Sequence, residues 1–119
     1  MKNVAGIDVH KDVLEIAYRK AGDIQVEEIP YTPDGMTRII KILRTHGIRE
    51  VFIESTGDYY YPLYYALKGA GIWVNVMNAY KIKRPEPNKT DERDAVWLLR
   101  IGETKLFNPS ISQRTIFSP

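Results

Sequence analysis

The order of the strand-like and helical segments constrains the fold of this chain more than any other feature. Three strand-like runs come first, over residues 4–9, 13–18 and 24–29, and short polar turns join them. The first run is almost continuously apolar, which is typical of a strand that is buried on both faces. Pro30 ends the third run, because proline cannot donate a hydrogen bond to a neighbouring strand. The sequence therefore predicts an antiparallel meander of three strands at the start of the chain.

After residue 30 the hydrophobic period changes, and helical and strand-like segments alternate. Apolar residues recur at helical spacing over residues 36–43. The later segments are a short apolar run, a helical stretch, a second apolar run and a last helical stretch, over residues 51–53, 60–67, 72–76 and 95–101. The order βββαβαβα predicts two crossovers to parallel strands. We expect an α/β domain with a five-stranded mixed sheet, which is the ribonuclease-H-like arrangement.

Length and composition narrow the class of protein. The 119 residues suit one domain over residues 1–105, and residues 106–119 have the weak pattern of a linker or a truncated C-terminal tail. Because the chain has no cysteine, metal ligands would have to be carboxylates or histidines. The net charge is only +2, so any surface that binds nucleic acid must be local. No apolar run approaches the roughly 20 residues of a membrane span, and we expect a soluble cytoplasmic protein.

Four acidic residues are candidate metal ligands: Asp8, Glu54, Asp91 and Asp94. Asp8 lies inside the first apolar run and Glu54 ends a later one, where a carboxylate is costly unless its charge is compensated. The predicted topology places these two strands side by side, and Asp91 and Asp94 share one face of a helix because they are three positions apart. We expect the four carboxylates to hold two Mg²⁺ or Mn²⁺ ions about 4 Å apart, which would assist phosphodiester cleavage.

Each acidic residue also has a simpler interpretation. Asp91 could favour the positive end of the helix dipole, and Asp94 could pair with a nearby cation. Glu54 could begin a loop, since Gly57 follows it. Asp8 is the hardest to explain in this way, because its neighbours are apolar on both sides.

Two further segments are candidates for contact with nucleic acid. The most basic stretch precedes the last helix and contains Lys81, Lys83, Arg84 and Lys89. It is either a solvated loop or a contact to backbone phosphates, which would make binding strongly dependent on salt. A dense run of tyrosines over residues 59–65 favours a core or partner interface, with stacking on bases as the alternative.

Three segments resemble a known family, the DEDD-type insertion-sequence transposases of the IS110 group, which are related to the Piv DNA invertase. The matching segments are residues 6–11, 53–59 and 89–95, and the last, Lys-Thr-Asp-x-x-Asp-Ala, is the most specific. The resemblance implies a RuvC-like catalytic domain in which Asp8, Glu54, Asp91 and Asp94 coordinate Mg²⁺. It also implies DNA recombination and transposition, guided by a structured RNA in some members, and a homo-oligomer of the full-length protein.

The resemblance departs from the family pattern after the last predicted helix. Family members continue into a second domain with a serine nucleophile, and none of Ser110, Ser112 and Ser118 takes that role here. We therefore expect a metal-dependent DNA-processing domain of a transposase or site-specific recombinase, incomplete in strand transfer without a second domain. Two alternatives stay open: a nuclease like a Holliday-junction resolvase, and a non-catalytic module for nucleic-acid binding or dimerisation.

Overall fold

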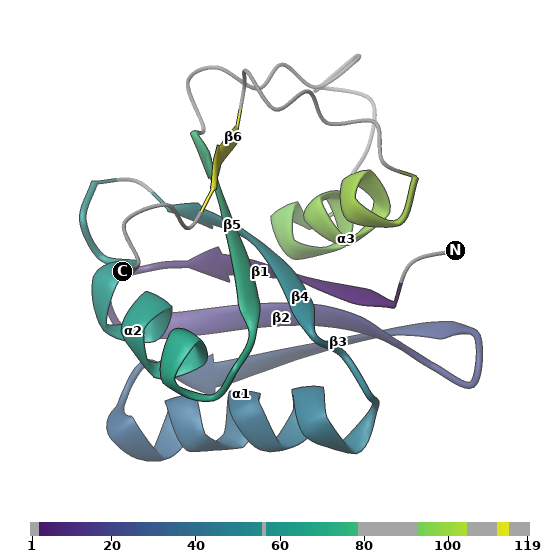
Figure 1. Ribbon diagram of the computed structural model, residues 1–119, viewed down its shortest axis with the longest axis horizontal. Helices are drawn as coiled ribbons and strands as arrows, with labels where there is room; N and C mark the ends of the chain where they lie inside the picture. The colour runs from purple at the N-terminus through teal and green to yellow at the C-terminus, as the bar shows by residue number, and fades with distance from the viewer. Residues whose placement is uncertain (1–2, 56, 79–92, 105–111, 115–119) are drawn as a thin grey trace.

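The computed structural model describes residues 3–55, 57–78, 93–104 and 112–114 (Figure 1). The strands are β1 (Val4–Val9), β2 (Val13–Lys20), β3 (Asp23–Pro30), β4 (Glu50–Ser55), β5 (Trp73–Asn78) and β6 (Ser112–Arg114). The helices are α1 (Pro33–Thr45), α2 (Tyr61–Gly69) and α3 (Asp94–Thr104). Each predicted strand and helix is present, and their order is the predicted one.

All strands belong to one mixed sheet with the order β3-β2-β1-β4-β5-β6. The meander pairs antiparallel, whereas β1 pairs with β4 and β4 with β5 in parallel. The predicted five-stranded mixed sheet is therefore confirmed. The short strand β6 adds an antiparallel edge next to β5 and was not predicted, because its sequence Ser-Gln-Arg has no apolar pattern.

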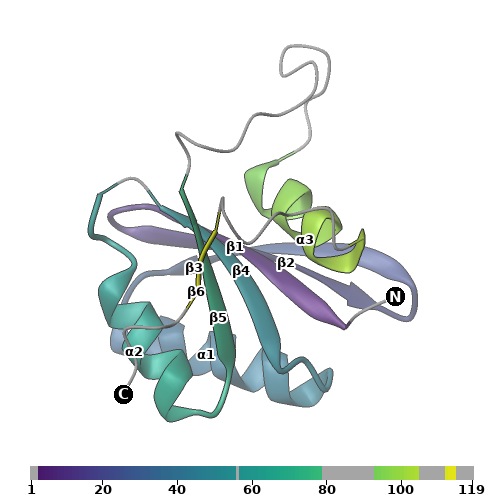
Figure 2. The same ribbon diagram turned by 45° about the horizontal axis from the view of Figure 1, so that its top comes forward.

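Helices cover both faces of the sheet, with α1 and α2 on one face and α3 on the other (Figures 1 and 2). Alternate residues of β1 point to opposite faces of the sheet, and both faces are covered by helices, so the run is almost entirely apolar. Ala5, Ile7 and Val9 belong to the core under α1 and α2. Val4 belongs to the second core under α3. Because successive side chains point to opposite faces, Asp8 lies on the same face as α3.

Local sequence signals explain where the first helix begins and ends. The side chain of Thr32 accepts a hydrogen bond from the backbone N–H of Gly35, 3.0 Å away, and Pro33 begins the helix. Gly47 follows the helix with a φ of 67°, a conformation that glycine adopts without strain.

The tyrosine run over residues 59–65 divides between two environments. Tyr64 is fully buried in the core, whereas Tyr65 is 58% exposed.

Two glycines let α3 lie directly on the centre of the sheet. A Cβ atom on Gly6 would clash with the carbonyl oxygen of Ala95 and would lie 2.6 Å from the backbone nitrogen of Leu99. A Cβ atom on Gly102 would lie 2.5 Å from the ring of Phe52. Glycine at both positions therefore allows a close approach of helix and strand that any larger residue would prevent.

Among the described residues, no helix has both the length and the apolar character that are needed to cross a membrane.

Candidate metal centre

Three of the four predicted acidic ligands come together at one end of the sheet. Asp8, Glu54 and Asp94 each offer a carboxylate oxygen, and these atoms all lie within 4.8 Å of one another. Asp8 and Glu54 are partner residues in the parallel ladder of β1 and β4, so their side chains leave the same face side by side. Asp94 is the first residue of α3, which lies over that face.

The fourth acidic residue, Asp91, lies outside the described residues, and so do Lys81, Lys83, Arg84 and Lys89 of the basic segment. The predicted helix over residues 95–101 is confirmed, and it extends from Asp94 to Thr104. Its first turn is closed by the backbone N–H of Trp97, which donates to the carbonyl oxygen of Arg93 at 3.0 Å.

The environment of the three carboxylates suits a divalent cation. Asp8 is buried, with 7% of its surface exposed, while Glu54 and Asp94 are half-buried. Like charges this close repel one another, and a bound cation would remove that repulsion. A donor set made only of carboxylate oxygens matches hard cations such as Mg²⁺ and Mn²⁺ better than metals that prefer sulfur.

A histidine lies at the rim of the cluster. The Nε2 atom of His10 is 3.0 Å from Oδ2 of Asp8, and the His10 side chain is 53% exposed. The sequence did not single out this contact, because His10 follows the strand in a polar turn. The contact is nevertheless compatible with the strand geometry, since residues two apart in an extended chain point to the same side.

A buried acidic residue that sequence reasoning missed lies beside the cluster. Glu15 of β2 is the antiparallel partner of Asp8, and only 9% of its surface is exposed. Nη1 of Arg93 is 2.6 Å from Oε2 of Glu15, and the same atom is 3.6 Å from Oε2 of Glu28 on β3. The signal that could have found Glu15 is the meander itself, because a fixed register places it opposite Asp8 on the same face.

A second ion pair holds the other end of α3 to the same strand. Arg19 of β2 donates from Nε to Oε2 of Glu103 at 2.8 Å and from Nη2 to Oε1 at 3.1 Å. Glu103 is buried, with 6% of its surface exposed. These hydrogen bonds hold the pKa of Arg19 above its usual value. Both ends of the helix that carries Asp94 are thus tied to β2.

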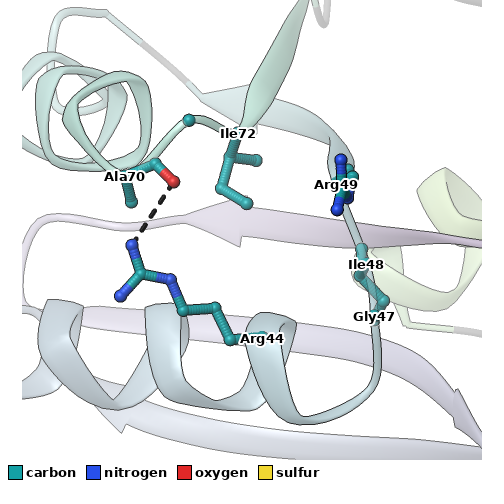
Figure 3. Close-up of a pocket in the computed structure, with 7 residues that line it drawn as sticks. Arg44, Gly47, Ile48, Arg49, Ala70 and Ile72 are labelled. Atoms are coloured by element: carbon teal, nitrogen blue, oxygen red, sulfur yellow. Dashed lines mark hydrogen bonds between the residues drawn. The ribbon is translucent and has the colours of Figure 1, made fainter.

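The structure also contains a surface pocket of about 310 Å³ between the end of α1 and the turn that precedes β5 (Figure 3). Arg44 and Arg49 line it, and Nη2 of Arg44 donates to the carbonyl oxygen of Ala70 at 3.5 Å. Residues 47–49 precede β4 and residues 70–72 precede β5, so the pocket lies where these parallel strands begin. Glu54 lies near the opposite end of β4, and the pocket is therefore separate from the acidic cluster.

Comparisons with known proteins agree with the geometry. The family model for transposases of the DEDD IS110 type matches residues 5–116. The transposase for insertion sequence element IS1533 of Leptospira borgpetersenii is 30% identical over 105 residues. That match covers 84% of this chain and 30% of the relative, so the chain spans about a third of the length of the curated relative that it matches.

A solved structure with a TM-score above 0.5 has a similar architecture. The Thermus thermophilus RuvC structure is similar with a TM-score of 0.55 at 14% identity, and the match covers 93% of this chain and 98% of that one. A structure of T. thermophilus RuvC in complex with a Holliday junction substrate has a TM-score of 0.47 at 16% identity, over 68% of this chain and 67% of that one. The fold is the predicted ribonuclease-H-like, RuvC-like one. By the extent of the family match, the chain belongs to the IS110 family of DEDD transposases.

Proposed function

We propose that this domain processes DNA by metal-assisted cleavage of phosphodiester bonds and takes part in strand transfer during transposition. The observation that carries the proposal is the convergence of Asp8, Glu54 and Asp94, whose carboxylate oxygens lie within 4.8 Å of one another. These residues come from three segments that are distant in the sequence, and membership of a transposase family supports the choice of DNA as the substrate.

The roles of the side chains follow from their positions. Asp8 and Glu54 project from neighbouring strands of a rigid sheet and would hold Mg²⁺, or Mn²⁺ as its substitute, at a fixed place. Asp94 would complete the ligand set from α3, together with Asp91 three residues earlier. A cation held there would neutralise charge on a phosphate and activate a water or hydroxyl group. The side chains themselves would bind, orient and space the ions.

The substrate would be held by groups outside the cluster. Lys81, Lys83, Arg84 and Lys89 are proposed contacts to backbone phosphates, because the segment that contains them leads directly into the helix of Asp94. A structured guide RNA and a homo-oligomer of a longer protein are part of the same proposal. Both are inferred from the family. They concern a longer protein in which this domain would supply the metal-binding part.

Metal binding and cleavage are tested separately. Calorimetry with Mn²⁺ should show binding to the parent chain and its loss in Asp8→Asn, which keeps the shape of the side chain. Asp23→Asn is the matched control, because Asp23 is an exposed acid at the start of β3. Equal Mn²⁺ affinity in the parent and in Asp8→Asn would overturn the metal site.

Cleavage is assayed on linear and branched DNA with Mg²⁺, with Asp8→Ala as the inactive reference. Cleavage that requires Asp8 supports the proposal, and cleavage confined to junctions would identify a resolvase-like nuclease instead. DNA binding with no cleavage, both by this chain and by a protein extended with the second domain of the family, would identify a non-catalytic module.

A further inference from the structure

One buried acidic side chain, Glu15, lies next to the cluster of Asp8, Glu54 and Asp94 but is not part of it. Glu15 is the register partner of Asp8 in the antiparallel pair of β1 and β2, where opposed Cα atoms lie about 4.5–5.5 Å apart. Opposed residues of neighbouring strands point to the same face, so Glu15 emerges on the face that carries the cluster. Among the described residues, however, the ligand atoms that converge come from Asp8, Glu54 and Asp94 and not from Glu15.

The side chain of Glu15 is instead engaged by Arg93. The 2.6 Å separation of Nη1 and Oε2 is that of a charge-assisted hydrogen bond, and the Glu15 side chain is 11% exposed. Arg93 immediately precedes Asp94, and its carbonyl oxygen accepts the first hydrogen bond of α3. Arg93 therefore pairs with Glu15 through its side chain and fixes the start of α3 through its backbone.

We propose that Arg93 is a positioning residue that limits the number of carboxylates reaching the cation. This inference rests on the proposed metal site. With Arg93 in place, the charge of Glu15 is compensated by a guanidinium that also lies near Glu28 of β3. Without it, Glu15 is a buried carboxylate next to Asp8 with no counter-ion among the described residues, and a divalent cation in the cluster is a nearby source of compensation. An added carboxylate tightens the binding of such a cation.

The ion pair at the far end of α3 provides a matched control. Arg19 and Glu103 also join α3 to β2, and Glu103 is as buried as Glu15. Arg19 lies four positions along β2 from Glu15, away from the metal ligands. If Arg93 merely anchored the helix, breaking either pair would change metal binding in the same direction. The proposal predicts that only breaking the Arg93 pair changes metal binding, because only the loss of Arg93 releases an acid next to the cation.

The test measures Mn²⁺ affinity by calorimetry and Mn²⁺ coordination by electron paramagnetic resonance. Arg93→Gln should raise the affinity several-fold and change the resonance spectrum. The double variant Arg93→Gln with Glu15→Gln should return both to the parent values, because the released carboxylate is gone. Arg19→Gln should lower the melting temperature and leave both metal readouts unchanged. Arg93→Lys keeps the charge but not the guanidinium geometry, and it should raise the affinity by less than Arg93→Gln.

Each contrary result is distinct. If Arg93→Gln binds Mn²⁺ as the parent does or more weakly, the inference is wrong, although the metal site stands. The inference is also wrong if Arg19→Gln raises the Mn²⁺ affinity as Arg93→Gln does. Should Arg93→Gln fail to fold, a fall in affinity in Arg93→Lys overturns the inference. If the parent does not bind Mn²⁺, or binds it equally well with Asp8→Asn, the proposed function fails and takes the inference with it.

Discussion

Asp8 of β1 and Glu54 of β4 are direct partners in the parallel ladder between the two central strands of the sheet. The ladder sets the spacing of their side chains, because each residue of β1 has a register partner in β4. The third carboxylate, Asp94, depends instead on how α3 is seated on the sheet. Strand pairing therefore sets the positions of Asp8 and Glu54 in the candidate centre, and helix packing sets the position of Asp94.

Removal of one carboxylate should stabilise the protein when no metal is bound. Asp8→Asn keeps the size of the side chain and removes one of the crowded negative charges. We expect a melting temperature about 4 °C higher in the presence of a chelator, which corresponds to roughly 1 kcal/mol. The contact with His10 offsets little of this gain, because that side chain is largely exposed. A lower melting temperature in thermal unfolding without metal would show that Asp8 has a structural role.

Substitution of the remaining proposed ligands should remove tight metal binding without unfolding the chain. Glu54→Gln and Asp91→Asn are each expected to lower the Mn²⁺ affinity by more than tenfold, about 1.4 kcal/mol or more. Glu15→Gln is the control, since Arg93 and not the cation is its expected partner. Calorimetry gives the affinity and circular dichroism the fold. Unchanged Mn²⁺ affinity in both ligand variants would refute the assignment.

The close approach of α3 to the sheet should be sensitive to a single methyl group. In Gly6→Ala the new Cβ meets the backbone of Ala95 and Leu99, which cannot move aside as a flexible side chain would. We expect a loss of roughly 1–3 kcal/mol in the free energy of unfolding, together with weaker Mn²⁺ binding as Asp94 is displaced.

The control for this prediction is Gly69→Ala at the end of α2, where no atom lies within 4 Å of the added Cβ. Alanine is the better helix former, so this variant should be as stable as the parent or more stable. Denaturant unfolding gives both free energies. Equal stability of Gly6→Ala and the parent would mean that α3 can shift without cost.

Stability should fall at high pH partly because of Tyr18. Burial, and then the hydrogen bond to Glu27, raise the pKa of Tyr18 to about 12, above the ordinary value of 10.0. A raised folded-state pKa contributes stability that is present below pH 10 and is lost as the pH rises toward 12. Tyr18→Phe cannot ionise and should lose less stability than the parent between pH 9 and pH 11, as measured by urea unfolding. The exposed Tyr65 offers a control substitution, Tyr65→Phe, and an equal pH dependence in the parent and Tyr18→Phe would contradict the prediction.

Most of the fold was predictable because each strand and helix has a clear hydrophobic period. The run over residues 4–9 predicted a strand buried on both faces, and β1 has apolar side chains in both cores. The strand β6 could not be predicted in this way, because its sequence Ser-Gln-Arg has no apolar residue and its pairing with the edge of β5 leaves no periodic pattern.

The candidate site was predictable only in part. Asp8 was conspicuous because a charge inside an apolar run requires an explanation, and its meeting with Glu54 followed from the topology. The pairing of Arg93 with Glu15 spans 78 positions and that of Arg19 with Glu103 spans 84. Such contacts depend on the depth at which α3 packs on the sheet, which leaves no local pattern in the sequence.

The seating of α3 on Gly6 has a consequence for biosynthesis. The strands of the meander, the parallel pair and both helices of the opposite face are all encoded before α3. A growing chain on the ribosome can therefore bury most of its core while the helix that carries Asp94 is still to be made. The convergence of Asp8, Glu54 and Asp94 would arise only after α3 has been made and has packed onto the finished sheet.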